Sequence, residues 1–155
     1  MNELVPLNSI PRGENCKLDD LPYLLKLGLS MQEVCEKNNG IGLSAVQVGI
    51  PLNFFIINIA KEYRFFVNCR YKPLSEEKIK SIEGCLSLKG RFFEVERFAD
   101  IVVKGKELNT NTLILEDIEE KPTGIMNAVF QHEIEHSLLI TVDLIGKEVF
   151  LWRDY

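Results

Sequence analysis

The sequence predicts an α+β fold, because helical periodicity lies toward its two ends and strand-like segments fill its middle. Apolar residues recur at helical spacing from about residue 21 to 38, and again from 125 to 136. Between 52 and 118, short segments rich in β-branched and aromatic residues alternate with turn residues. The order helix, strands, helix is typical of an α+β domain and not of a doubly wound parallel sheet.

The first helix has clear start and stop signals. Asp19 and Asp20 can cap its N-terminus, and Pro22 suits its first turn. Gly28 interrupts the helix at a cost in stability, which predicts a close contact there, and Gly40 is a stop signal. The apolar residues expected on its inner face are Leu24, Leu27, Met31, Val34 and Cys35. Residues 1–18, with two prolines and little periodicity, are expected to form an extended arm.

The middle of the chain is expected to form strands and the end a second helix. The predicted strands are 52–59, 65–68, 92–95, 101–103 and 113–115. Pro122 and Thr123 are expected to open the last helix, which runs to residue 136. The segment after Ser137 does not favour one type of structure. With no internal repeat or linker, residues 1–155 are expected to form a single domain.

Composition and charge exclude several classes of function. With 18 basic and 23 acidic residues and a net charge of −5, the chain has no field that would attract nucleic acid or an anionic membrane. Its start lacks a signal-peptide pattern, and its most apolar run, 52–60, is too short to cross a bilayer. The four cysteines are far apart and form no C-x-x-C pair. Reduced thiols and a cytoplasmic location are therefore expected.

The two histidines of the chain, His132 and His136, both lie in the segment HEIEH at 132–136. Residues four apart share one face of a helix, so both imidazoles can reach one metal ion. Glu133 can lean toward a water at that ion without being a ligand. The pattern predicts metal-assisted hydrolysis of a carbonyl compound.

The third metal ligand separates the possible hydrolases. A zinc metalloprotease takes it from a downstream segment, where Asp143, Glu148 and Asp154 are available but resemble no such ligand segment. Upstream, Cys85 lies in EGCLS at 83–87, at an expected strand end, and could offer a thiolate. Gln47 closes the segment GIGLSAVQ at 40–47 and could donate a hydrogen bond. Each segment also has an ordinary structural interpretation. Cys85 could be a small buried thiol, and the glycines at 40 and 42 could be a helix stop and a turn.

Together, the three segments resemble the peptide deformylases, which carry G-φ-G-φ-A-A-x-Q, E-G-C-φ-S and H-E-x-x-H in this order, where φ is apolar. The resemblance extends from about residue 21 to 143. Asn68, Arg97 and Gln131 are smaller points of agreement. The resemblance implies antiparallel strands wrapped around the helix that carries HExxH. It also implies removal of the formyl group from N-formylmethionyl nascent peptides.

The resemblance further implies a role for each matching residue. Cys85, His132 and His136 would hold one divalent metal ion, with Fe²⁺ as the native ion and Zn²⁺, Ni²⁺ or Co²⁺ as possible replacements. Glu133 would move the proton. The Gln47 side-chain amide would stabilise the oxyanion. The backbone N–H of Leu86 would be the second donor.

Four residues are expected to bind the substrate. Val129 and Ile125 lie one and two turns before His132 on roughly the same helix face, and with Ile41 they would form an apolar pocket for the methionine side chain. The peptide backbone is expected to pair beside Gly42 as an added β-strand.

The chain departs from the family pattern at several positions. Ser44 replaces an alanine, and its buried hydroxyl would need a partner. Glu135 replaces the usual aspartate, and Cys69 follows Asn68 where proline is common. The usual glycine after the second histidine is absent. Glu83 and Arg97 are expected to pair behind the cysteine strand.

The last residues leave no length for the C-terminal helix with which bacterial deformylases dock on the ribosome, so docking by that route is not expected. Such short forms are known from phages and organelles, and a phage protein would act in the host cytoplasm. A monomer is expected. The alternative functions are another metal amidase or peptidase, or an inactive, metal-stabilised binding protein.

Overall fold

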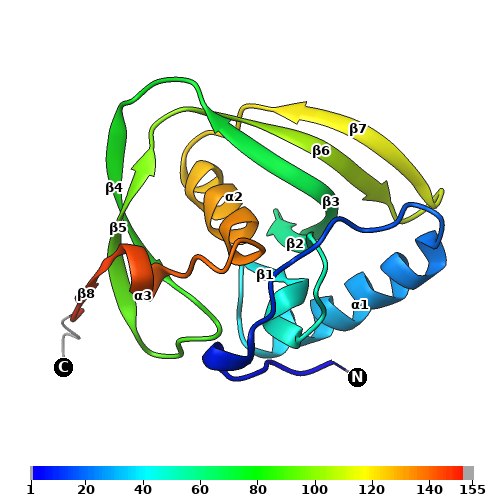
Figure 1. The fold of residues 1–155 in the computed structure, drawn as a ribbon, viewed down its shortest axis with the longest axis horizontal. Coiled ribbons are helices and arrows are strands. Elements are labelled where there is room, and N and C mark those ends of the chain that lie inside the picture. The colour runs from blue at the N-terminus through cyan, green and yellow to red at the C-terminus, as the bar shows by residue number, and fades with distance from the viewer. Residues whose placement is uncertain (1, 152–155) are drawn as a thin grey trace.

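The computed structural model of the protein describes residues 2–151, in which two antiparallel sheets enclose helix α2 (Figure 1). The helices are η1 (Leu7–Ser9), α1 (Leu21–Lys37), η2 (Ala45–Val48), α2 (Ile125–His136) and α3 (Val142–Ile145), where η marks a 3-10 helix. The strands are β1 (Gly42–Ser44), β2 (Phe54–Ile59), β3 (Glu62–Pro73), β4 (Lys78–Gly84), β5 (Phe92–Phe98), β6 (Ile101–Asn109), β7 (Ile114–Glu120) and β8 (Lys147–Val149). The predicted α+β fold, with strands around the HExxH helix, is confirmed.

Within residues 2–151, β1, β2, β3, β6 and β7 form a five-stranded sheet in that order, and β4, β5 and β8 form a three-stranded sheet. All paired neighbours are antiparallel. Helix α2 lies between the two sheets, and α1 covers the other side of the five-stranded sheet (Figure 1). The HExxH motif is therefore held at the centre of the molecule.

Helix α1 follows its predicted boundaries. The Asp20 carboxylate accepts a hydrogen bond from the backbone N–H of Tyr23 at 3.0 Å, which caps the first turn. At Gly28 a Cβ atom would lie 2.3 Å from the Phe65 ring, so the predicted close contact is confirmed. The predicted inner face is buried along its length, at Leu24, Leu27, Met31, Val34 and Cys35.

Strand β2 is buried on both faces, which explains its unbroken apolar sequence. Phe54 and Ile56 pack into the core beneath α1, whereas Phe55 and Ile57 pack into the core beside α2. The Phe55 ring stacks on Phe66 at 5.0 Å between centroids. Both rings meet Phe130 of α2 edge-on. This aromatic cluster fixes the depth of α2 against the sheet.

Three short or exposed strands, β1, β4 and β8, lie outside the predicted ranges, and other strands are longer than predicted. Strand β4 was missed because most of its side chains are exposed, so lysines interrupt the apolar alternation. Strand β8 was missed because it has three residues. Strands β3, β6 and β7 extend well beyond the predicted 65–68, 101–103 and 113–115. Helix α2 begins at Ile125, later than predicted, because Gly124 takes the N-cap position.

The N-terminal arm is tied to the body by backbone hydrogen bonds. In the largely extended arm, Val5 N–H donates to Gln47 O at 2.9 Å, and Gly13 N–H donates to Ser137 O at 2.9 Å. None of the helices in residues 2–151 is long and apolar enough to cross a membrane. The predicted lack of length for a C-terminal helix concerns residues 152–155, which lie outside the described residues.

Candidate metal centre and active site

A cleft of about 650 Å³ opens between α2, the end of β4 and the start of β1. It is lined by nearly all of the residues singled out in the sequence, namely Ile41, Gly42, Gln47, Cys85, Leu86, Ile125, Val129, His132 and Glu133. His136 is 1% exposed and lies buried behind this surface. Three segments distant in sequence thus meet at one cavity.

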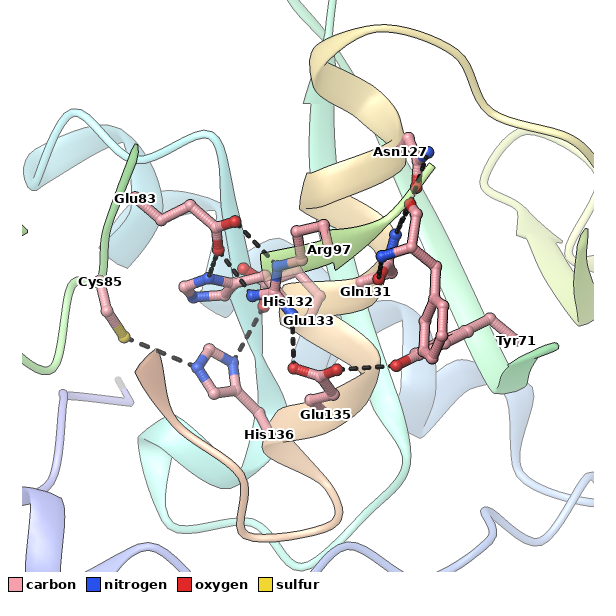
Figure 2. Close-up of polar contacts among 11 residues, drawn as sticks. Tyr71, Glu83, Cys85, Arg97, Asn127, Gln131, His132, Glu133, Glu135 and His136 are labelled. Carbon is pink, nitrogen blue, oxygen red and sulfur yellow. Dashed lines mark hydrogen bonds and ion pairs between the residues drawn. The ribbon is translucent and has the colours of Figure 1, made fainter. Parts of the chain in front are cut away.

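Cys85, His132 and His136 form a compact cluster of metal-ligating groups (Figure 2). Cys85 follows the end of β4, and the two histidines lie one turn apart on α2. Their ligand atoms all lie within 4.8 Å of one another, and Cys85 Sγ is 3.6 Å from His136 Nε2. One thiolate and two imidazoles suit a single divalent transition-metal ion.

Both histidines turn Nδ1 toward a carboxylate and leave Nε2 for a metal. His132 Nδ1 lies 2.9 Å from Glu83 Oε1. His136 Nδ1 lies 3.3 Å from Glu133 Oε2. Such contacts hold the ring orientation of metal-binding histidines and select the ligating nitrogen.

A buried ion-pair network supports this arrangement from behind (Figure 2). The Arg97 side chain is 2% exposed and donates to Glu83 through Nε at 2.8 Å and Nη2 at 2.6 Å. Its Nη1 donates to Glu135 Oε2 at 2.6 Å. Glu135 Oε1 accepts from the Tyr71 hydroxyl at 2.7 Å. The expected Glu83–Arg97 pair is present, and Glu135 extends the network to β3.

Gln131 attaches α2 to the three-stranded sheet. Its side-chain oxygen accepts from Phe98 N–H at 3.1 Å, and its amide donates to Phe98 O at 3.0 Å. The neighbouring amide of Asn127 donates to Phe98 O at 3.2 Å. These contacts fix the height of α2 along β5, and with it the position of the two histidines.

The charges of the cluster favour a bound cation. Burial raises the pKa of Cys85, but His132 and His136 outweigh it, and the pKa falls to about 6. Burial lowers the pKa of His132, but Cys85 and Glu83 outweigh it, and the pKa rises to about 10. Burial raises the pKa of Glu133, but His136 outweighs it and holds the pKa below its usual range. Anionic groups therefore surround the imidazoles, and a divalent cation can compensate this charge.

Gln47 is 1% exposed and is oriented by the backbone beside it. Its side-chain oxygen accepts from Ser44 N–H at 2.9 Å. The amide nitrogen consequently turns toward Cys85 Sγ, at 3.5 Å, and donates to Ser87 Oγ at 3.0 Å. Gly42 leaves room for the Glu133 carboxylate, since a Cβ at this glycine would lie 3.0 Å from Glu133 Oε1.

Sequence reasoning missed several contacts of this site. Tyr71 was not predicted, because nothing in its segment of the sequence indicates that β3 passes the C-terminal end of α2, where Glu135 lies. The contact of Ser87 with Gln47 was open to prediction, since Ser87 belongs to the cysteine motif. Ser44 was expected to need a partner, and that partner is Glu133.

Comparison with known proteins gives a consistent result. A family model described as polypeptide deformylase matches residues 16–142. The peptide deformylase of Carboxydothermus hydrogenoformans is 34% identical over 115 residues, which cover 74% of this chain and 72% of that protein. That of Pelagibacter ubique is 34% identical over 102 residues, which cover 63% of this chain and only 56% of that protein.

Solved structures resemble almost all of this chain. The crystal structure of peptide deformylase from Thermotoga maritima matches with a TM-score of 0.81 and 30% identity, covering 94% of this chain and 97% of that chain. A probable peptide deformylase from synechococcus phage S-SSM7 matches with a TM-score of 0.82 and 26% identity, covering 94% and 99%. The fold and the Cys–His–His cluster define the class, a deformylase-like fold with a candidate metal centre. The chain belongs to the polypeptide deformylase family.

Proposed function

We propose that this protein is a metal-dependent peptide deformylase that hydrolyses the formyl–amine bond of N-formylmethionyl peptides. The observation that carries the proposal is the convergence of Cys85, His132 and His136 beside Glu133 at the wall of the cleft. Membership of the deformylase family supports the same reaction.

We assign the metal to Cys85, His132 and His136, with Fe²⁺ as the native ion. A divalent ion held there would polarise the formyl carbonyl and lower the pKa of a water molecule. The donor set also suits Zn²⁺, Ni²⁺ and Co²⁺, so reconstitution of the metal-free protein with each ion tests the assignment. The highest turnover is expected with Fe²⁺ under anaerobic conditions.

The chain's own residues move the proton and stabilise charge. The Glu133 carboxylate takes a proton from the attacking water and later gives it to the departing amine, so that formate and a free methionine amine leave. The amide of Gln47, directed toward Cys85, and the backbone N–H of Leu86 stabilise the oxyanion that forms when the carbon becomes tetrahedral.

Substrate selection is assigned to the walls of the cleft. Ile41, Ile125 and Val129 offer apolar surface to the methionine side chain. Strand β1 is an edge strand, and within residues 2–151 it pairs only with β2. This supports addition of the peptide as an extra strand beside Gly42. The formyl carbon carries only hydrogen, so a tight site at the metal would exclude an acetyl group.

Turnover of a formyl-Met tripeptide by anaerobically purified protein, with metal content measured on the same sample, tests the proposal. We expect about one metal ion per chain. Turnover should be lost in Glu133→Gln, while metal remains bound, and an acetyl-Met peptide should not react. Bound metal without turnover of the formyl peptide would contradict the proposal and favour an inactive binding protein. Turnover of acetyl-Met or unblocked peptides would favour a different amidase or peptidase.

The proposal places the reaction on nascent chains in the cytoplasm and assigns it to a monomer. Analytical ultracentrifugation of the metal-loaded protein checks the monomer. A dimer at assay concentration would contradict it.

A further inference from the structure

We propose that Ser44 is a positioning residue for Glu133, whose hydroxyl holds one carboxylate oxygen so that the other faces the cleft. The contact between Ser44 and Glu133 rests on geometry alone, whereas its effect on catalysis rests on the proposed function. The family pattern usually has alanine at this position, and an alanine has no hydroxyl to make this contact.

The hydroxyl of Ser44 lies within hydrogen-bond distance of two oxygens of Glu133, and it also lies 3.4 Å from His136 Nδ1. Its Oγ is 2.9 Å from Glu133 Oε2 and 2.9 Å from the Glu133 backbone oxygen. Ser44 is 0% exposed and Glu133 is 5% exposed, so water does not compete strongly for these contacts. Ser44 thus joins the end of β1 to the last turn of α2.

The two carboxylate oxygens of Glu133 have different surroundings. Oε2 receives the Ser44 hydroxyl and lies 3.3 Å from His136 Nδ1. Among the described residues, Oε1 has no hydrogen-bond partner. It is not one of the fully buried side-chain atoms that lack a partner, so it keeps some access to solvent. It lies beside Gly42, which together with Glu133 lines the cleft. The geometry therefore assigns Oε1 as the oxygen that accepts the proton of the attacking water.

The hydroxyl suits both protonation states of Glu133. While the carboxylate is ionised, the Ser44 hydroxyl donates a charge-assisted hydrogen bond to Oε2. When Oε1 has accepted the proton, the same hydroxyl donates to Oε2 or turns to the backbone oxygen at equal distance. Ser44 forms and breaks no covalent bond in the reaction, and its proton stays on Oγ.

An alanine at position 44 would leave Oε2 facing only His136 and would free the carboxylate to rotate. The orientation of a general base contributes to catalysis through the geometry of proton transfer, and Ser44 is buried and does not line the cleft. The loss should therefore appear in kcat, while KM stays close to that of the wild type.

The test compares Ser44→Ala with Ser44→Thr and with a matched control, Ser137→Ala. Ser137 is a buried serine at the C-terminal end of α2, the helix that carries Glu133. Its hydroxyl makes no hydrogen bond within the described residues. Steady-state kinetics on a formyl-Met tripeptide should show kcat reduced about tenfold in Ser44→Ala, with KM changed less than about twofold. Ser44→Thr keeps a hydroxyl and should recover most of kcat, and Ser137→Ala should match the wild type.

A second readout does not depend on turnover. Crystal structures of the wild type and Ser44→Ala should show one Glu133 conformer in the first, with Oε2 on Ser44, and a displaced or divided carboxylate in the second. If no variant hydrolyses the peptide, the proposed function fails while this comparison still decides the contact. An unchanged kcat in Ser44→Ala, a loss confined to KM, equal losses in the alanine and threonine variants, or an unmoved carboxylate would each overturn the inference.

Discussion

The Arg97 guanidinium and the Glu83 carboxylate form a two-bond ion pair, with N–O distances of 2.8 and 2.6 Å. Both side chains are buried, and the Glu83 oxygen at 2.6 Å from Arg97 also lies 2.9 Å from His132 Nδ1. The ring of one assigned metal ligand is therefore held by a carboxylate that is itself held by a cation.

Removing the Arg97 side chain should weaken both the fold and the metal centre. Arg97→Ala would leave Glu83 and Glu135 buried without their cation, and breaking such a pair costs about 3–5 kcal/mol. Urea unfolding and metal retention during dialysis against a chelator check the two effects. As a control, Arg91→Ala removes an exposed pair with Glu148 and should change neither. Full metal retention in Arg97→Ala would argue against the supporting role.

Replacing Gln47 should lower kcat with little change in KM, because its amide is assigned to the oxyanion. We expect Gln47→Ala to lose about 10²–10³-fold in kcat. Ser87→Ala removes the side chain that accepts from Gln47 and leaves the amide in place, so a much smaller loss is expected. Steady-state kinetics on a formyl-Met tripeptide separate the two parameters. Equal activity of Gln47→Ala and the wild type would remove Gln47 from the mechanism.

Cys85 should be the reactive thiol of the metal-free protein. Its pKa of about 6 makes it mainly a thiolate at pH 7, whereas burial raises the pKa of Cys16 and Cys35 to about 11 and that of Cys69 to about 12. Brief treatment with iodoacetamide at pH 7, followed by mass spectrometry, should find one modified site. Bound metal should protect it. Modification of Cys69 before Cys85 would contradict the assignment.

The Glu83 carboxylate should stabilise the metal-free protein down to strongly acidic pH. Burial raises its pKa, but Arg97 and His132 outweigh burial and lower it from 4.5 to about 2. Because the pKa is lower in the folded state, the stabilisation is fully present above about pH 4.5 and is lost as the pH falls through 2. The difference in unfolding free energy between the wild type and Glu83→Gln, measured with chelator from pH 6 downward, should shrink in that window. A constant difference would contradict the lowered pKa.

A charge in the apolar wall of the cleft should reduce the preference for methionine. Val129→Glu places a carboxylate where the methionine side chain is expected, and burying it there is unfavourable. The ratio of kcat/KM for formyl-Met and formyl-Ala peptides should fall at least about tenfold. Ile114→Glu, on the exposed surface of β7, controls for the added charge. An unchanged ratio would exclude Val129 from the pocket.

The sequence predicted the parts of the fold in which burial leaves a periodic pattern. Helix α1 and strand β2 are apolar where they contact the core, so both were found with nearly correct bounds. The range of strand β4 escaped prediction because its pairing with β5 is made by the backbone, while most of its side chains face solvent. That strand carries Glu83 and leads into Cys85; the sequence indicated a strand end there, but its length and its pairing with β5 came from the folded structure.

The candidate site was predictable from three motifs but not in its supporting contacts. The three motifs contain chemical groups that suit one reaction. Site residues between positions 41 and 136 could therefore be predicted from the sequence alone. Tyr71 and the role of Ser44 depend on how β3 and β1 pass α2, and no local pattern encodes such long-range contacts.

A bound ion would have a mechanical effect, because its three assigned ligands come from two different layers of the fold. Cys85 continues from the three-stranded sheet, whereas His132 and His136 lie on the helix that packs against the five-stranded sheet. An ion at this point would cross-link the layers and close the long loop between them, so its departure would loosen the body as well as stop the reaction. Limited proteolysis before and after chelation would measure that loosening. Copies that have lost their ion would then be the ones that cellular proteases degrade first, which would remove inactive molecules without a dedicated sensor.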